Sequence, residues 1–319
     1  MEQGLTHPAS MCGVFVGESN LAAPAGVLRN NRGDIILEKM DNLTRAALTN
    51  AMAKEISQGG GTRYGGLLLD LRPNISSEEG MGMWRARMKR GQFDAVRLAY
   101  GEAAFRWEEP WDVAPAHYFM GGVKVNTSGE SSVRGLYAAG QAMGGIHGGN
   151  RLGSVSLAEL FVFGFAAGEA AARESKSRVP LHFSREKFDN ITGLIGRKGS
   201  FSPLKLQRRL QKTMWERVGI TRHEADLQVA LKEIEEVRKD FADVNISPHK
   251  LYNRDIWHAL ELQHMLTAAE LITRSALLRQ ETRGAHFRLD FPHKDEENWR
   301  RNIVVFKEED KMKIYTEAV

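Results

Sequence analysis

The sequence contains one cysteine, Cys12, among 319 residues. A single thiol excludes an internal disulfide framework, because every bridge joins two cysteines. It also excludes an iron–sulfur cluster held by this chain alone, because such clusters are ligated by about four thiolates. We therefore predict no metal site in this chain, and any cluster is expected to lie on a partner.

A targeting segment and a long apolar run are also absent from the sequence. Residues 1–12 lack the basic start and the apolar core of a signal peptide. The longest apolar stretch, Leu157–Ala172, carries Glu159 and Glu169 and is shorter than the roughly 20 residues that span a bilayer. These absences favour a soluble, cytoplasmic chain.

Charge of one sign is scarce as well. The 44 basic and 40 acidic side chains leave a formal charge of only +4, and no basic patch is interleaved with aromatic residues. Nucleic acid is therefore not an expected partner, although a small anion remains a plausible ligand. With 42% apolar and 26% charged residues, the composition is that of a globular protein, and the length suggests about two domains.

The chain lacks the glycine-rich turn that binds a dinucleotide pyrophosphate. No Gly-x-Gly-x-x-Gly follows a predicted strand anywhere in the sequence. The glycines at 59–61 and 65–66 are no substitute, because they follow a predicted helix and lead into a predicted strand. We therefore expect no pyrophosphate-binding turn within this sequence.

What the sequence does contain is a glycine-rich block from His117 to Leu160, which includes the histidines His117 and His147 and, flanked by glycines, Arg151. This block closely resembles the C-terminal part of the flavin-binding domain in the succinate dehydrogenase and fumarate reductase flavoprotein family. A second block, Glu281–His286 followed by Asp290–Pro292, resembles the C-terminal segment of that family. Two blocks in the family's order argue against chance similarity. The family's N-terminal half, with its pyrophosphate turn and covalent flavin histidine, has no counterpart here.

The resemblance implies an α+β/α/β fold: a partial FAD-binding domain with an inserted capping domain, followed by a C-terminal helical bundle domain. Residues 1–8 are expected to form a residual strand of the FAD-binding domain. The expected parts after it are a capping domain (9–114), the C-terminal segment of the FAD-binding domain (115–178), the helical bundle (179–285) and a C-terminal extension (286–319).

The hydrophobic patterns predict individual elements within these parts. The predicted helices are Leu43–Ile56 with Asn42 as N-cap, Leu157–Ala172, Leu206–Val218, His223–Phe241 and Asn253–Arg279. A buried strand is predicted at Leu67–Leu69, ending at a proline turn, and a strand and turn at Gly135–Gly140. The small residues of Leu157–Ala172 are expected to let that helix pack closely against a sheet.

The resemblance assigns four residues to a dicarboxylate substrate. Arg151 matches an arginine that binds one carboxylate, and a guanidinium suits this role because it donates two parallel hydrogen bonds. His117 and His7 match two further substrate contacts, although Ala9 replaces the threonine of the family's His-Pro-Thr motif. Ser19 stands in for a substrate threonine, in a segment where the family's Arg-Gly-Glu-Gly run is absent.

Arg45 is the predicted catalytic residue. It sits at the start of a predicted helix, where the family has an arginine that delivers the proton to the substrate carbon, although the usual following aspartate is Ala46. Arginine is a weak acid, so this role requires a closed, dehydrated pocket and a carboxylate relay. A surface arginine on a helix is the alternative interpretation.

The resemblance also implies FAD as cofactor. The residues matched to flavin contacts are Gly140, Gln141, Asn150, Ser156 and Leu157, with Gln141 replacing a glutamate of the family. Backbone amides at the start of the helix near Leu157 can face the electron-rich edge of the flavin ring.

The implied function is hydride transfer between FAD and a carbon–carbon bond of a dicarboxylate, in a succinate dehydrogenase/fumarate reductase-type enzyme that passes electrons to an iron–sulfur subunit. That subunit is one expected partner. The other is an FAD-binding N-terminal half or chain, without which the chain is expected to be inactive; membranes are reached only through partners. Two alternatives remain: an L-aspartate oxidase-like or other dicarboxylate flavoenzyme, and a non-catalytic remnant that acts as a partner-binding scaffold.

Overall fold

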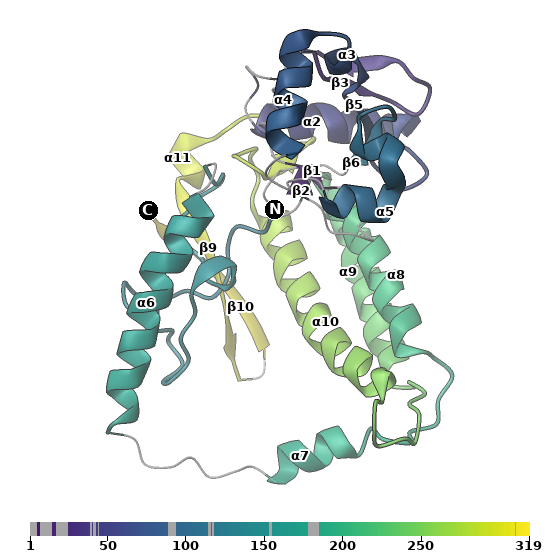
Figure 1. Ribbon diagram of the computed structural model, residues 1–319. Coiled ribbons are helices and arrows are strands. Elements are labelled where there is room, and N and C mark those ends of the chain that lie inside the picture. Colours follow the sequence, from purple (N-terminus) through teal and green to yellow (C-terminus); the bar gives the residue numbers. More distant parts are fainter. Residues whose placement is uncertain are drawn as a thin grey trace. The chain divides into compact units, whose positions relative to one another are not determined.

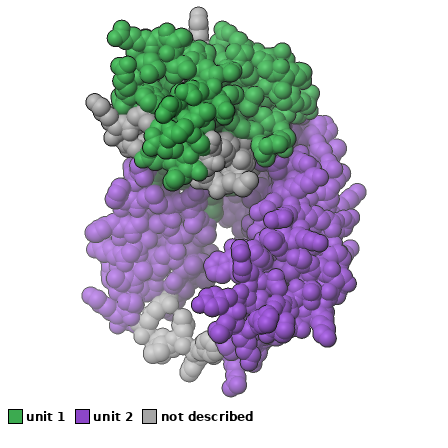
Figure 2. Space-filling model, turned by 45° about the vertical axis from the view of Figure 1, so that its right-hand side comes forward, with its two compact units in different colours: residues 1–122, 144–156 green, residues 123–143, 157–319 purple. Residues whose placement is uncertain are grey.

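The computed structural model (Figure 1) contains two compact units, which are coloured separately in Figure 2. Unit 1 comprises residues 1–122 and 144–156, and unit 2 comprises residues 123–143 and 157–319. The residues that the structure describes are 5–6, 15–16, 25–38, 40, 43, 45–88, 94–113, 116, 118–152, 155–177, 185–309 and 311–319.

A four-stranded antiparallel sheet in the order β4–β3–β5–β6 forms the centre of unit 1. Its strands are β3 (Val27–Arg29), β4 (Ile35–Leu37), β5 (Leu67–Asp70) and β6 (Trp111–Val113). On β5, Leu69 pairs with Leu28 of β3 and with Trp111 of β6, and all three are buried. The buried strand predicted at Leu67–Leu69 is therefore confirmed.

Short helices surround this sheet. They are α2 (Arg45–Glu55), the π-helical turn η2 (Ile56–Gly60), α3 (Arg72–Ile75), α4 (Glu78–Met88) and α5 (Asp94–Phe105). The two-residue strands β1 (Leu5–Thr6) and β2 (Phe15–Val16) pair with each other in antiparallel orientation. The predicted helix at Leu43–Ile56 is confirmed as α2, which ends at Glu55 and continues into η2, where the φ of 85° at Gly59 breaks the helical backbone. The predicted N-cap Asn42 lies outside the described residues. The side chains of Met52, Phe105 and Trp107 join the sheet in one apolar core.

Asp70 ties the end of β5 to its neighbours. Its carboxylate accepts hydrogen bonds from Arg29 Nε (2.8 Å) on β3 and from Arg72 Nε (2.8 Å) and Nη2 (2.9 Å) at the start of α3. The hydrogen bonds from Arg72 lower the pKa of Asp70 to about 2, against the opposing effect of its burial. Pro73 follows in the first turn of α3, where its missing N–H costs nothing, so the predicted proline turn is also present.

The segment of unit 2 from 123 to 143 is mostly irregular, and here one prediction is wrong. Instead of a strand within Gly135–Gly140, the structure has an isolated bridge between Tyr137 and Glu130 and the 3₁₀ turn η3 (Gly140–Ala142). Gly135 and Gly140, with φ values of 79° and 67°, confine any extended backbone to the four residues between them, and within these Tyr137 makes a bridge rather than a strand ladder.

Helix α6 (Val155–Ser175) confirms the predicted apolar helix, but it is 21 residues long and so longer than Leu157–Ala172. Only two of its described residues are buried, Glu159 and Ala167. Close packing is seen where a side chain on Gly129 would meet Ala167, whereas Gly164 and Gly168 face open space within this chain. The predicted contact with a sheet is therefore not made by the described residues.

The length and composition of α6 alone would also suit a membrane span, the only helix in the described part of the chain for which this holds. The estimate from the sequence, that the apolar stretch is too short, therefore needs correction. One such helix is weak evidence for a span, and α6 carries a buried carboxylate at Glu159 together with Glu169 and Arg173.

A bundle of three long helices makes up much of unit 2 (Figure 1). These are α8 (Pro203–Arg217), α9 (Glu224–Phe241) and α10 (Arg254–Leu278), with the shorter α7 (Arg185–Thr192) before them. Leu210, Ile234 and Leu262 share one apolar core. The three predicted helices are confirmed to within a few residues, as expected from their 3.6-residue periodicity.

Small elements close the chain. Strand β7 (Thr221–Arg222) pairs in parallel with β8 (Phe287–Arg288), and α11 (Glu296–Trp299) leads into a hairpin of β9 (Arg301–Glu308) and β10 (Lys311–Ala318). The boundaries predicted at residues 8, 114, 178 and 285 remain predictions.

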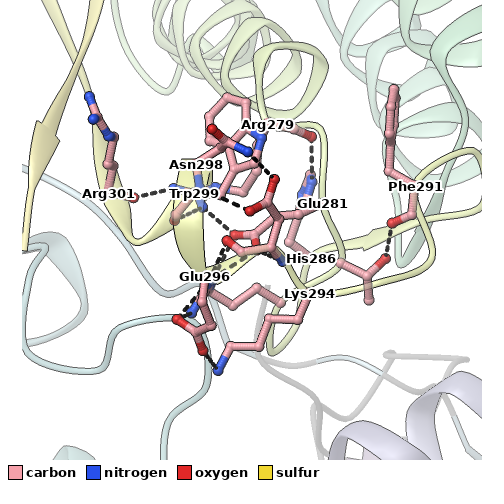
Figure 3. A network of polar contacts seen from close by, with 12 residues as sticks. Arg279, Glu281, His286, Phe291, Lys294, Glu296, Asn298, Trp299 and Arg301 are labelled. Atoms are coloured by element: carbon pink, nitrogen blue, oxygen red, sulfur yellow. Dashed lines mark hydrogen bonds and ion pairs between the residues drawn. The ribbon is translucent and has the colours of Figure 1, made fainter.

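A network of polar contacts joins this last segment to the end of α10 (Figure 3). Glu281 is fully buried and accepts hydrogen bonds from Arg279 Nη1 (2.6 Å), Arg283 Nε (2.7 Å) and the backbone N–H of Asp295 (3.0 Å). Burial alone would raise the pKa of Glu281, but these hydrogen bonds, led by that from Arg283, hold it below its ordinary value. A buried carboxylate is thus kept charged by two cations and a backbone donor.

Candidate functional site

Arg151 is the centre of the candidate site in unit 1. The residue is only 5% exposed, and its Nη1 donates to Ser156 Oγ at 2.9 Å, in the first turn of α6. Its backbone N–H points to Met120 Sδ at 3.0 Å, which links the block around 150 to the segment after Tyr118. A guanidinium held among bare glycine backbone can donate paired hydrogen bonds to a carboxylate, so this position is a candidate for binding an anion.

Two aromatic side chains accompany Arg151. The guanidinium carbon lies 4.6 Å from the centre of the Tyr118 ring, a cation–π distance. The Tyr118 hydroxyl lies 3.4 Å from His147 Nε2, and the two rings meet edge to face at 73°. The sequence motifs included both residues, yet neither was predicted to be functional. Their spacing gives the only signal: Tyr118 follows His117, and His147 precedes Arg151 by four residues.

The backbone around these side chains depends on glycine at a few points. Gly145 and Gly148 have φ values of 111° and 55°, in the region that other residues avoid. A Cβ atom on Gly144 would lie 2.9 Å from the backbone nitrogen of Gly122, so the two glycine segments approach more closely than side chains would permit. Such bare backbone is what a flat ring system needs for close approach.

Asn150 provides a further sign that the site fits a ligand. Its side-chain oxygen Oδ1 is buried and has no hydrogen-bond partner among the residues that the structure describes. A buried acceptor without a donor is unfavourable by roughly 1–3 kcal/mol, so a donor is expected from a ligand or from residues outside the described ranges. Asn150, Ser156 and the amides at the start of α6 together suit the polar edge of a flavin.

The remaining predicted cofactor residues belong to unit 2. Gly140 is buried with a φ of 67°, and a Cβ atom there would lie 2.4 Å from the Leu160 side chain. Gln141 is exposed, and Leu157 is 60% exposed on α6. Gly140 is thus required by local packing whether or not a cofactor contacts it.

The structure brings together Arg151 and Ser156 from the predicted set. His7, Ser19 and His117 lie outside the described residues, so their predicted roles stay predictions. Arg45 is the first residue of α2, as predicted, but its side chain also lies outside the description.

Glu159 is a residue of chemical interest that the sequence motifs did not assign. It is 4% exposed on a helix whose other polar side chains are accessible. Among the described residues, no group of three or more histidine, cysteine or acidic side chains is arranged to hold a metal ion.

Two family models match the chain. Residues 1–157 match the FAD binding domain, and residues 207–319 match the fumarate reductase flavoprotein C-terminal domain. The two matches fall in the order in which the glycine-rich block and the Glu281–His286 block occur.

Curated relatives include fumarate reductase subunits. The chain is 34% identical to one component of the fumarate reductase (CoM/CoB) of Methanothermobacter marburgensis, over 95% of its own length and 54% of the relative. It is 35% identical to the fumarate reductase flavoprotein subunit of Haemophilus influenzae over 63% of its length and 35% of that protein. The chain therefore spans about half the length of the first of these relatives and less of the second.

Solved structures agree with this assignment. Quinol fumarate reductase of E. coli matches 100% of the chain with a TM-score of 0.82 and 27% identity, and 58% of that protein is covered. The Sdh1 complex of Mycobacterium smegmatis matches 99% of the chain with a TM-score of 0.77 and 28% identity, covering 53% of its own chain. The mixed fold of an FAD-binding part and a helical part is thus shared with these proteins.

Proposed function

Because the chain belongs to the fumarate reductase and succinate dehydrogenase flavoprotein family, we propose that it forms the dicarboxylate-binding part of an FAD-dependent oxidoreductase. FAD is the cofactor of this family. The buried Arg151, which donates to Ser156 and lies over the Tyr118 ring in a glycine-rich backbone, is the observation that carries the proposal. It provides a cation where an anionic substrate can reach both it and the start of α6.

The residues of this chain then bind and polarise the substrate. Arg151 donates paired hydrogen bonds to one carboxylate, and His117 and His7 hold the other end of the dicarboxylate. Cations at both carboxylates stabilise the negative charge that develops as the carbon–carbon double bond between them is reduced to a single bond or formed from one. FAD, when bound, supplies or accepts the hydride. Arg45 moves the proton at the adjacent carbon.

The exposed face of α6 supports a further part of the proposal. Leu157, Phe161 and Phe165 are 60%, 78% and 74% exposed and recur at helical spacing on one side of the helix. An apolar face of this size is normally covered in a folded protein. We infer that the rest of an FAD-binding domain covers it, on the same polypeptide or on another, because the chain spans only about half of its relatives.

The electron acceptor belongs to the same proposal. In this proposal the electrons pass to an iron–sulfur cluster. Because one cysteine cannot hold such a cluster, it lies on a separate subunit. The chain reaches a membrane only through such partners, on the cytoplasmic side.

The test begins with the flavoprotein that contains this chain, isolated from its source cells. We expect a flavin absorption spectrum, activity with succinate or fumarate, and companions that include an iron–sulfur subunit when they are identified by mass. Arg151→Lys keeps the charge but loses paired donation, so kcat/KM should fall by at least about 100-fold. Arg134→Ala is the matched control, because the Arg134 side chain is 82% exposed and forms an ion pair with Glu174. The activity of this variant should stay at the wild-type level.

A colourless protein without companions would contradict the proposal. So would a flavoprotein whose activity with every dicarboxylate tested is unaffected by Arg151→Lys.

A further inference from the structure

We propose that Tyr118 and His147 are positioning residues that fix the plane of the Arg151 guanidinium for paired hydrogen bonding to a carboxylate. The inference rests on the proposed function, because it names how the substrate-binding arginine is held. It starts from a geometric need. A guanidinium donates two parallel hydrogen bonds only when its plane coincides with the plane of the carboxylate, so that plane must be set before the substrate arrives.

Two contacts restrain the guanidinium from different directions. The hydrogen bond from Nη1 to Ser156 Oγ, at 2.9 Å, fixes one edge within the guanidinium plane. The Tyr118 ring, 4.6 Å from the guanidinium carbon, supports the group from the ring's electron-rich face. With the hydroxyl contact alone, the guanidinium could still rotate about its Nη1 hydrogen bond. With the ring contact alone, it could still slide across the face of the ring. The two contacts together remove both freedoms.

Burial strengthens the ring contact. Tyr118 is 8% exposed and Arg151 is 5% exposed, so water competes little for the cation. Cation–π attraction is largest in desolvated pairs of this kind. By contrast, the pair formed by Arg63 over the Tyr64 ring, at 4.5 Å, has a tyrosine that is 46% exposed.

His147 in turn holds the Tyr118 ring. Its Nε2 lies 3.4 Å from the tyrosine hydroxyl, and the ring centres are 5.8 Å apart at 73°. An edge-to-face contact and a polar contact at the ring's far end resist both tilting and rotation of the phenol. The backbone also couples the two residues to the arginine, because Asn150 N–H donates to His147 O at 3.3 Å and Arg151 N–H approaches Met120 Sδ.

A rival assignment is that the Tyr118 hydroxyl itself binds the substrate. The two assignments differ in which part of the side chain matters. Positioning requires the aromatic face above all, whereas a substrate contact requires the hydroxyl. Tyr118→Phe retains the face and loses the hydroxyl, and Tyr118→Leu loses both.

The experiment measures binding of malonate, an unreactive dicarboxylate, to the FAD-loaded flavoprotein by calorimetry. Tyr118→Leu should raise the malonate Kd by about 10-fold, and Tyr118→Phe by no more than about 3-fold. His147→Leu should also weaken binding, and His147→Gln should restore most of it because an amide can hydrogen-bond to the hydroxyl. Tyr64→Leu is the matched control and should leave the Kd unchanged. An equal loss in Tyr118→Phe and Tyr118→Leu would overturn positioning in favour of a direct contact.

A double-mutant cycle then asks whether Tyr118 acts through the arginine. In an Arg151→Lys background the plane of the guanidinium no longer exists, so Tyr118→Leu should change the malonate Kd by less than about 2-fold. Fully additive losses would refute the proposal.

A readout that needs no substrate separates this proposal from the proposed function. The Arg151 Nε–H resonance in nitrogen-15 spectra of the FAD-loaded protein should carry an upfield shift from the Tyr118 ring. That shift should vanish in Tyr118→Leu and persist in Tyr118→Phe. If wild type binds no dicarboxylate, the proposed function fails, while an unchanged resonance in Tyr118→Leu would refute positioning by itself.

Discussion

Buried charged residues in this chain serve different purposes. Arg288 is 1% exposed and is satisfied inside the fold: it donates to the carbonyl oxygens of Ala276, Leu277 and Arg279 and pairs with Asp290. Arg222 likewise donates to the carbonyls of Val218 and Gly219. These two arginines close the ends of α10 and α8, where helix carbonyls otherwise lack donors. Arg151 also contacts a hydroxyl, that of Ser156, and lies over the Tyr118 ring, within the glycine-rich block that carries the family resemblance.

His286 lies between these structural arginines and should make stability depend on pH. Its Nδ1 accepts from Arg222 Nη1 at 2.6 Å, and its Nε2 lies 3.1 Å from Arg279 O. Burial, together with the charges of Arg222, Arg279 and Arg288, lowers the pKa of His286 from 6.5 to about 3. Below pH 6.5, His286 therefore binds a proton in the unfolded chain but stays neutral in the folded chain. Stability should be complete above pH 6.5 and should fall by up to about 1.4 kcal/mol per pH unit as the pH drops toward 3.

Urea unfolding at several values between pH 5 and 6.5 measures this slope. His286→Gln keeps an acceptor and a donor but cannot titrate. The slope of the free energy of unfolding against pH should therefore become shallower, by the contribution of nearly one bound proton near pH 5. His293→Gln is the control, because His293 is exposed on the same segment. Asp70 and Asp290, with pKa values of about 2, act only below this range. An unchanged slope in His286→Gln would contradict the assignment of a neutral buried histidine.

At the scale of elements, a side-chain cap helps to fix where α10 begins. Asn253 Oδ1 accepts from the backbone N–H groups of Asp255 and Ile256, and its amide donates to Ser247 O and His249 O at 2.8 Å each. One side chain thus starts α10 and closes the loop before it. Ser202, at the matching position of α8, makes no such side-chain hydrogen bond.

The two caps should respond differently to the same substitution. Asn253→Ala removes two acceptor contacts and two donor contacts, so the free energy of unfolding should fall by about 1–2 kcal/mol. Ser202→Ala removes no cap contact and should change it by less than about 0.5 kcal/mol. Urea denaturation monitored by circular dichroism compares them. Equal losses in the two variants would show that the cap of α10 does not matter energetically.

For the whole molecule, the open question in the fold is what covers α6. Its phenylalanines Phe161 and Phe165 are largely exposed in this chain, and our proposal is that the rest of an FAD-binding domain covers them. Gly164 and Gly168, which face open space, would let a partner segment approach the helix closely.

Replacing Phe161 and Phe165 by serine tests this assignment. Both side chains are largely exposed, so unfolding of this chain should change by less than about 1 kcal/mol in the double variant. In the complete flavoprotein, the ratio of bound flavin to protein should fall at least about 10-fold, because the covering segment loses its apolar contact. Leu98→Ser, at an 88% exposed position on α5, is the control and should retain the flavin. Full flavin retention in the double variant would rule out this face as the junction.

The sequence by itself determined the family, the cofactor class and most helices. Periodic apolar residues locate α8, α9 and α10 to within a few positions, since a helix that buries one face must repeat every 3.6 residues. Local motifs also predicted a binding role for Arg151, because the glycines beside this arginine form a motif that can be recognised in the sequence. Gly135–Gly140 failed as a strand, because the positive φ values of its glycines depend on packing that periodicity does not record.

Only the tertiary structure decided which side chains meet. The cation–π contact of Arg151 with Tyr118, the contact of Tyr118 with His147 and the burial of Glu281 between two arginines join residues whose partners are set by three-dimensional packing. The same holds for α6, whose apolar composition alone fits a core helix or a membrane span equally well. Exposure and contact are properties of the folded chain, because a side chain's environment depends on every segment that packs around it.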